Sequence, residues 1–180
     1  LTLCLTLLVG AACSDSGLRE ISLDHMEDTG QPNLSVIEEG AVLLTYLRQT
    51  EAGPELSFRK LSSGVWSEPG VITSNKELLV NWADFPSVIH FNNRYVAQWL
   101  VRKLGAGFAY DVFVSTSDDE GMTWSSAIRL HQDDTPTEHG FVSLYADSEG
   151  VGAFWLDGQR YANSDPSEQG MELRHTRVFQ

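Results

Sequence analysis

Residues 87–100, SVIHFNNRYVAQWL, hold the pattern that decides the fold: a short apolar strand, a tight turn, and a second strand ending in an aromatic residue and Leu. The same pattern occurs at 35–47 (SVIEEGAVLLTYL) and at 143–156 (SLYADSEGVGAFWL). The aromatic–Leu pairs recur at spacings of 53 and 56 residues. Repeats of this length, each made of several strands, are typical of the blades of a β-propeller.

A second marker supports the repeat. Trp66-Ser67 and Trp124-Ser125 lie 58 residues apart, each after a Gly-containing turn. Val, Ile and aromatic residues dominate the apolar runs, and Gly, Asn, Asp and Ser separate them, which favours strands over helices. The second repeat predicts strands at 87–91, 95–101, 111–116 and 126–130, and the third repeat ends in a strand at 172–178. We therefore expect an all-β propeller of which this chain holds about three blades, as the N-terminal part of a longer protein.

Composition excludes several classes of function. The 180 residues are 42% hydrophobic and 21% charged, which is enough apolar sequence for a packed core. The formal net charge of −13 makes the chain a poor nucleic-acid binder, because phosphate neutralisation needs clustered Lys and Arg. The two cysteines, Cys4 and Cys13, both lie at the N-terminus. The globular part therefore has neither a disulfide scaffold nor a thiolate zinc site.

The N-terminus predicts export. Residues 1–12, LTLCLTLLVGAA, have the character of a secretory signal peptide that is truncated at its start. Cys13 follows, as in a bacterial lipoprotein, so we expect a lipid on Cys13 and a periplasmic or cell-surface, membrane-attached protein. The alternative is plain cleavage after Ala12, which gives a soluble secreted protein. Residues 13–32 are a predicted linker, and 33–180 are the propeller.

Residues 117–124, SDDEGMTW, match the Asp-box pattern Ser-x-Asp-x-Gly-x-Thr-Trp at every defined position. An Asp in such a turn accepts hydrogen bonds from nearby amides, Gly allows a backbone conformation that other residues resist, and Trp packs between blades. We expect a structural role, on the propeller face opposite the usual site. The residues that carry it are Ser117, Asp119, Gly121, Thr123 and Trp124.

The repeat length, the Asp-box and the segments NWADFPS (81–87) and TEHGFVS (137–143) together resemble the sialidase (neuraminidase) superfamily, and more narrowly the bacterial BNR-repeat sialidase-like proteins. The resemblance covers residue 33 to the end and implies a six-bladed propeller. Sialidases cleave terminal sialic acids from glycans with an arginine triad, an Asp acid/base and a Tyr nucleophile assisted by a Glu. The family's Arg-Ile-Pro motif does not occur in this chain.

Propeller topology predicts where a site lies. The segments that precede the first strand and follow the second strand of each blade converge on one face. Asp84, between aromatic residues, is the candidate general acid. Glu138 and His139 are further candidates for acid/base chemistry or for hydrogen bonding to a sugar. The alternatives are a capped turn before Pro86 for Asp84 and a His that is satisfied by the backbone.

Substrate-binding candidates come from the same loops. Arg102 and Arg160 can clamp a carboxylate in bidentate fashion. The alternative is a solvated loop arginine, which the sequence favours slightly for Arg48. Trp82 can stack on a sugar or pack between blades, and Asp157 can bind hydroxyl groups or start a turn.

A metal site is an alternative that we weigh and set aside. Five possible metal ligands lie close together in the sequence between residues 131 and 139, but their spacing matches no known zinc pattern. The cluster comprises His131, Asp133, Asp134, Glu138 and His139. We expect no metal and no cofactor.

The sequence leaves three functions open. The first is an exported exo-α-sialidase-like glycoside hydrolase that acts on a glycan ending in sialic acid. The second is a non-catalytic propeller that binds a glycan or a protein partner. The third is cleavage of a related acidic sugar on the same face.

Overall fold

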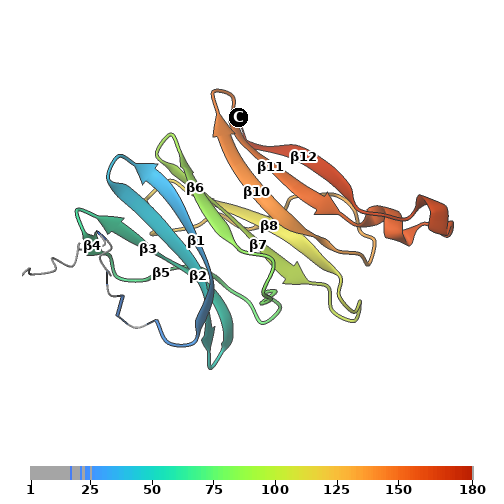
Figure 1. Ribbon diagram of the computed structural model, residues 1–180, viewed down its shortest axis with the longest axis horizontal. Coiled ribbons are helices and arrows are strands. Elements are labelled where there is room, and N and C mark those ends of the chain that lie inside the picture. Colours follow the sequence, from blue (N-terminus) through green and yellow to red (C-terminus); the bar gives the residue numbers. More distant parts are fainter. Residues whose placement is uncertain (1–16, 18–20, 22, 25, 180) are drawn as a thin grey trace, which may run out of the picture.

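The computed structural model describes residues 17, 21, 23, 24 and 26–179. It shows three antiparallel sheets, one for each sequence repeat, standing side by side in chain order (Figure 1). This arrangement confirms the predicted β-propeller architecture, and the sheets are its blades 1, 2 and 3. The predicted signal peptide and Cys13 lie outside the described residues. No helix in the described part of the chain is long and apolar enough to cross a membrane.

Blade 1 begins earlier than expected, because its first strand includes the last four residues of the predicted linker. Its third strand, β3, pairs with β2 and then with two shorter segments, β4 and β5. The strands are β1 (Thr29–Glu38), β2 (Ala41–Thr50), β3 (Gly53–Ser62), β4 (Val65–Trp66) and β5 (Gly70–Ser74).

Blades 2 and 3 follow the predicted strands closely. The last strand of blade 2 is shorter than predicted, and blade 3 carries two short 3-10 helices between its second and third strands. Blade 2 contains β6 (Ser87–Phe91), β7 (Arg94–Arg102), β8 (Tyr110–Ser117) and β9 (Ile128–Arg129). Blade 3 contains β10 (His139–Asp147), β11 (Gly150–Asp157), η1 (Gln159–Ala162), η2 (Pro166–Glu168) and β12 (Glu172–Phe179).

Apolar side chains hold the blades together. Between blades 1 and 2, Leu43, Leu56 and Val88 are fully buried in one cluster. A second cluster between blades 2 and 3 contains Val112 and Trp155. Because β-strand side chains alternate between the two faces of a sheet, the middle blade packs against a neighbour on each side.

Strand register defines two ends of the blades. Ser87 pairs with Gln98, and Arg102 pairs with Tyr110, so the start of β6, the end of β7 and the start of β8 share one end. We call this end the Asp84 face, because residue 84 lies just before β6. The opposite end carries the β6–β7 turn and residues 117–124, and we call it the Asp-box face.

Hydrogen bonds within residues 117–124 explain the Asp-box turn. One oxygen of Asp119 accepts from the Thr123 backbone N–H at 2.8 Å, and the other accepts from the Thr123 hydroxyl at 2.6 Å. The Gly121 N–H donates to Ser117 Oγ at 2.8 Å. Hydrogen bonds from the Thr123 side chain and backbone lower the pKa of Asp119 to about 2. The Trp124 ring packs edge-on against Phe58 of blade 1, which links the turn to the core.

The Trp-Ser marker has the same structural role in two blades. In blade 2 the Ser125 hydroxyl accepts from the Thr116 N–H, while the Ser125 N–H donates to the Thr116 carbonyl. In blade 1 Ser67 makes the same two bonds with Lys60. Each Ser therefore holds the outer edge of its blade against the third strand.

Candidate active site

Asp84 lies at the junction of blades 2 and 3 and is only 7% exposed. Its Oδ2 accepts a hydrogen bond from Asn81 Nδ2 at 2.8 Å. Its Oδ1 accepts from the backbone N–H of Phe141, at the start of blade 3, at 2.7 Å. The Asn81 side chain in turn accepts from the backbone N–H groups of Ala83 and Asp84, which shapes the loop before Pro86. Asp84 therefore fixes the geometry at the centre of this face.

Tyr110 lies beside Asp84. Burial, together with the negative charges of Asp84 and Glu138, raises the pKa of the Tyr110 phenol well above its usual value. A methyl group on Gly140 would stand 2.7 Å from Asp84 Oδ1 and 2.8 Å from Tyr110 Cε2. Glycine is therefore required where the backbone of blade 3 passes this pair. The Asp84 and Glu138 carboxylates therefore both lie close enough to this buried phenol to affect its ionisation.

Exposed aromatic residues adjoin Asp84 in the chain and at the start of blade 3. Trp82 is 88% exposed, in contrast to the interface packing that is common for propeller tryptophans. Phe85, which follows Asp84 in the chain, is also exposed. Phe141, whose backbone N–H donates to Asp84, is exposed as well. Exposed aromatic rings beside convergent polar groups are characteristic of ligand sites.

His139 is not where the sequence interpretation placed it. Its side chain is fully buried, with Nδ1 3.2 Å from the Tyr110 carbonyl oxygen and Nε2 2.8 Å from Asp133 Oδ2. A ring enclosed in this way does not reach a substrate. The structural alternative, a His satisfied by its surroundings, describes this residue. It joins blade 3 to blade 2.

The possible metal ligands form a different cluster from the one expected. Donor atoms of Asp111, His131 and His139 lie within 4.8 Å of one another, as do those of Asp133, His139 and Asp157. The two imidazole rings are stacked, with centroids 4.0 Å apart and planes 13° apart. Ring nitrogens bind metals in the plane of the ring, so this stacking disfavours one ion shared by His131 and His139, whereas the group of Asp133, His139 and Asp157 contains only one imidazole.

Cations already accompany the carboxylates of this cluster. Lys103 Nζ is 3.0 Å from Asp111, and Arg174 Nε is 3.7 Å from Asp157. Burial and the neighbouring His139 lower the pKa of His131 to about 4. Hydrogen bonds from Thr135 and His139, although opposed by burial, lower the pKa of Asp133 to about 2. The arrangement is a polar seam between blades 2 and 3.

Two of the three predicted substrate-binding arginines form hydrogen bonds within their own blades. The Arg48 guanidinium donates to Glu55 at 2.7 Å, across a hairpin in which the two residues are direct partners. Arg160 Nε donates to the Glu168 carbonyl at 2.9 Å. Arg102 is exposed at the end of β7.

Asp157 is buried rather than open to a sugar. Its Oδ2 accepts from Trp155 Nε1, and its Oδ1 accepts from the Gln159 N–H, each at 2.9 Å. The turn-forming alternative describes this residue, and the predicted role in binding hydroxyl groups does not fit its burial.

A cleft that the sequence analysis missed opens beside Glu138. Its volume is about 360 Å³, and Phe108, Tyr161 and Met171 are its large apolar lining residues. One feature of the sequence could have indicated this cleft: the aromatic residue Phe108 in the Gly-rich loop LGAGF (104–108), where no core position was expected. The cleft lies on the Asp84 face because strands β7 and β11 both end at that face, and the loops that line the cleft begin there.

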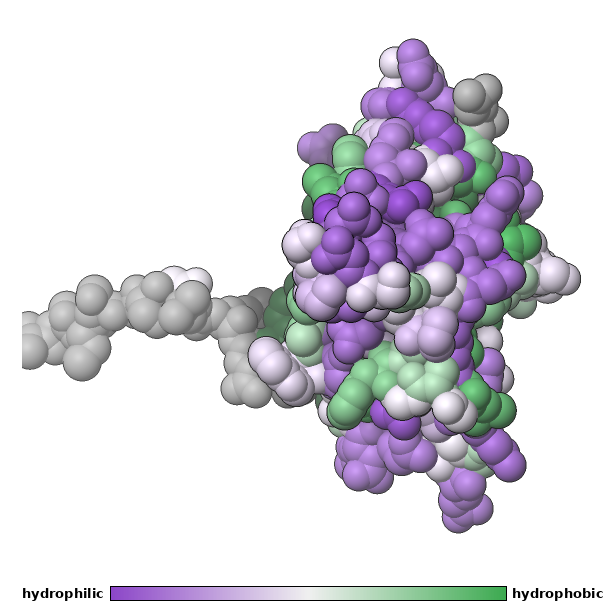
Figure 2. Space-filling model, turned by 90° about the vertical axis from the view of Figure 1, so that its right-hand side faces the viewer, coloured by the Kyte–Doolittle hydropathy of each residue, from purple (hydrophilic) through white to green (hydrophobic). Residues whose placement is uncertain are grey.

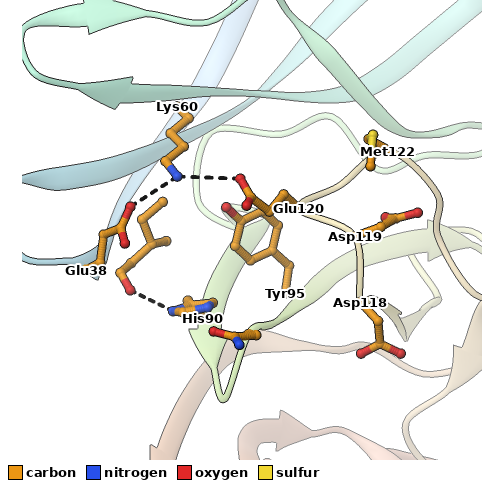
Figure 3. A pocket seen from close by; sticks show the side chains of 10 residues that line it. Glu38, Lys60, His90, Tyr95, Asp118, Asp119, Glu120 and Met122 are labelled. Carbon is orange, nitrogen blue, oxygen red and sulfur yellow. Dashed lines mark hydrogen bonds and ion pairs between the residues drawn. The ribbon is translucent and has the colours of Figure 1, made fainter.

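A larger cavity, about 720 Å³, lies instead on the Asp-box face between blades 1 and 2 (Figure 3). Its charged groups pair with one another. Lys60 Nζ is 3.1 Å from Glu38 and 3.6 Å from Glu120, and the hydrogen bond to Glu38 raises the pKa of Lys60. Figure 3 shows Lys60 between these two carboxylates. This cavity is larger than the cleft beside Glu138, but we do not take it as the candidate active site. Its central cation, Lys60, is already neutralised by Glu38 and Glu120.

No model of a known protein family matches the sequence, and no curated protein sequence matches it. Solved structures do resemble the fold. An endo-arabinase from Bacteroides thetaiotaomicron gives a TM-score of 0.55 at 14% identity, over 84% of this chain and 56% of that one. An α-L-arabinanase from Penicillium chrysogenum, complexed with arabinobiose, gives 0.55 at 11% identity, over 81% and 45%. A GH43_1 enzyme from Xanthomonas citri gives 0.52 at 12% identity, over 83% and 51%.

These likenesses establish a propeller fold shared with glycoside hydrolases. This chain spans about half the length of these structures. The three neighbours are not described as sialidases, so the comparisons support the predicted propeller fold and do not support the sialidase superfamily. The total of six blades remains a prediction from the resemblance.

Proposed function

We propose that the full-length protein is a glycoside hydrolase whose substrate binds at the Asp84 face. The observation that supports this most is the placement of two carboxylates, Asp84 and Glu138, beside one buried Tyr110 phenol. Glycosidases generally use a pair of carboxyl groups, one to protonate the leaving group and one to act as base or nucleophile. Exposed aromatic rings beside Asp84 supply apolar surface on which a sugar ring can pack.

We assign different roles to the two carboxylates. Both oxygens of Asp84 accept hydrogen bonds from N–H groups, so Asp84 is oriented as an acceptor and suits the role of base or stabiliser of positive charge. Glu138 is only partly buried and borders the open cleft, so it is the proton donor to the leaving group. This assignment replaces the sequence-based choice of Asp84 as the general acid.

We propose a neutral sugar, of the arabinose-containing kind that the neighbours' names mention, as the first substrate class. Recognition of sialic acid requires arginines that are free to bind a carboxylate. Arg48 is paired with Glu55, and Arg160 is bonded within its own loop. A sialidase is the second candidate, favoured by the Asp-box and by the segments at 81–87 and 137–143.

The test is a substrate panel with the full-length protein. Linear arabinan, arabino-oligosaccharides and sialyllactose are incubated with the wild type and with Glu138→Gln, and released sugar is measured. We expect turnover of an arabinose-containing substrate that falls at least about 100-fold in the variant, as for loss of a general acid. Turnover of sialyllactose alone would select the sialidase. Binding without turnover of any substrate would select the non-catalytic propeller.

Export to the periplasm or cell surface, with a lipid on Cys13, is part of this proposal and rests on residues 1–13 of the sequence. A glycan-degrading enzyme meets its polymeric substrate outside the cytoplasm, which agrees with such a signal. Metabolic labelling with a radioactive fatty acid tests the attachment. Label is expected on the wild type and not on Cys13→Ser, and equal label on both would contradict it.

A further inference from the structure

The cleft beside Glu138 is built from two loops of different blades. The loop at 103–109 follows β7 and is closed by a hydrogen bond from the Lys103 N–H to the Ala109 carbonyl at 2.8 Å. The segment 158–171 follows β11 and projects from blade 3 at the right of Figure 1. The Gly158 N–H donates to the Glu138 carbonyl at 2.8 Å, so this second wall begins beside Glu138.

The segment 158–171 is braced by its own hydrogen bonds. Arg160 Nε donates to the Glu168 carbonyl, and Gln169 Nε2 donates to the Asn163 carbonyl, each at 2.9 Å. Asp165 caps η2 by accepting from the Ser167 N–H at 2.9 Å. A wall held in this way presents its side chains in a fixed geometry, which lowers the entropic cost of binding a ligand.

Large apolar side chains on these walls are left open to solvent. Phe108 is 87% exposed and Tyr161 is 51% exposed, and both line the same cavity. Figure 2 faces the side of the molecule where blade 3 lies and shows hydrophobic patches within a mostly hydrophilic surface. Exposed apolar side chains that gather in one cleft are characteristic of a ligand-binding groove.

The chemistry of the cleft selects the occupant. Thr137 and Glu138 supply polar groups on one side, and the aromatic and thioether side chains supply apolar surface on the other. A sugar ring has hydroxyl groups at its edge and C–H groups on its faces, so it matches both kinds of wall. The volume of about 360 Å³ lies within the range of small-molecule sites.

We propose that this cleft is a subsite for the sugar unit next to the one held at Asp84, so that the protein favours glycans whose leaving group is a sugar over glycosides with a smaller leaving group. Glu138 is shared between the carboxylate pair and the cleft, which places the scissile bond between the two subsites. The inference rests on the proposed function, because it takes Glu138 as the proton donor.

The test compares Phe108→Ala and Tyr161→Ala with wild type in the full-length protein. Leu104→Ala is the matched control, because Leu104 is 79% exposed in the same loop and does not line the cleft. Values of kcat/KM are measured on methyl arabinofuranoside, whose leaving group places no sugar in the cleft, and on arabino-oligosaccharides from the disaccharide upward. We expect each cleft variant to lose roughly threefold to tenfold on every oligosaccharide and little on the methyl glycoside, by analogy with aromatic packing energies. Leu104→Ala should match wild type on every substrate.

Equal losses on the methyl glycoside and on the oligosaccharides, or no loss at all, would overturn the subsite. If the wild type hydrolyses no glycan, the proposed hydrolysis fails, and titration calorimetry with the same oligosaccharides decides the cleft separately. Weaker binding by Phe108→Ala would then support it, and unchanged or absent binding would contradict it. Thermal unfolding of each variant excludes a general loss of structure.

Discussion

The Asp84 carboxylate accepts a hydrogen bond from the backbone N–H of Phe141 at 2.7 Å and thereby joins blade 2 to the first strand of blade 3. Phe141 has a φ of 51°, in the left-handed region that a bulky residue avoids. The hydrogen bond helps to hold this conformation, in which the Phe141 ring is exposed beside the carboxylate. One bond therefore serves both the assembly of the blades and the shape of the site.

Removing the Asp84 side chain should destabilise the protein. Asp84→Ala leaves a buried N–H without its partner, and we expect the free energy of unfolding to fall by about 1–3 kcal/mol. Asp84→Asn keeps one oxygen that can accept from Phe141, so its loss should be smaller. Chemical denaturation of the full-length variants measures both, and equal losses would contradict the role of this bond.

Gly140→Ala should disturb the same junction from the other side. Its methyl group would lie within 2.8 Å of both Asp84 and Tyr110, so we expect destabilisation of about 1–3 kcal/mol. Gly170→Ala is the matched control, because a Cβ there has no neighbour within 4 Å. Thermal unfolding compares the two, and similar melting temperatures would show that the junction tolerates the methyl group.

The stacked His131 predicts a pH dependence of stability. Burial and His139 lower the pKa of His131 to about 4 in the folded protein, whereas an unfolded His titrates near 6.5. The unfolded chain therefore binds an extra proton between these values, and stability falls as the pH drops through this window. The loss attributable to His131 is on the order of 3 kcal/mol at most.

His131→Gln removes this titration. Its free energy of unfolding, measured by denaturant between pH 7 and pH 4, should fall less steeply than that of wild type. Asp119 and Asp133, with folded pKa values of about 2, contribute mainly below this range. Identical slopes in the two proteins would contradict the assignment to His131.

Asp119→Ala should lower stability without impairing the site. The variant loses the hydrogen bonds to Thr123 that close the Asp-box turn. We expect a lower melting temperature and a kcat/KM within about twofold of wild type, because the turn lies at the opposite end of the blades. A melting temperature equal to that of wild type would show that the turn forms without Asp119.

Much of the fold could be predicted from the sequence because strand signals are local. Residues 87–91 form the strand that was expected, since the consecutive β-branched residues Val88 and Ile89 beside an Asn-Asn turn carry this information within a few residues. The pairing of two strands in a hairpin also depends on residues that are close together in the sequence. The Arg48–Glu55 ion pair follows from the β2–β3 register and could have been deduced once that turn was placed.

Burial of the polar residues could not be predicted in the same way. His139 lies next to Glu138 in the chain, yet one is enclosed and the other borders a cleft. The difference arises from partners outside the local strand pattern: the Tyr110 carbonyl, 29 residues away, and the Asp133 carboxylate in the preceding loop. The cleft depends likewise on two loops from different blades, whose meeting no single repeat encodes.

The most direct test of the Asp84 face compares two matched substitutions in the full-length protein. Asp84→Asn and Asp119→Asn each remove one carboxylate, at opposite ends of blade 2. On the best glycan substrate of the panel, kcat/KM should fall at least about 100-fold in Asp84→Asn and stay within about twofold of wild type in Asp119→Asn. A large loss in Asp119→Asn with full activity in Asp84→Asn would place the chemistry on the Asp-box face and contradict the account.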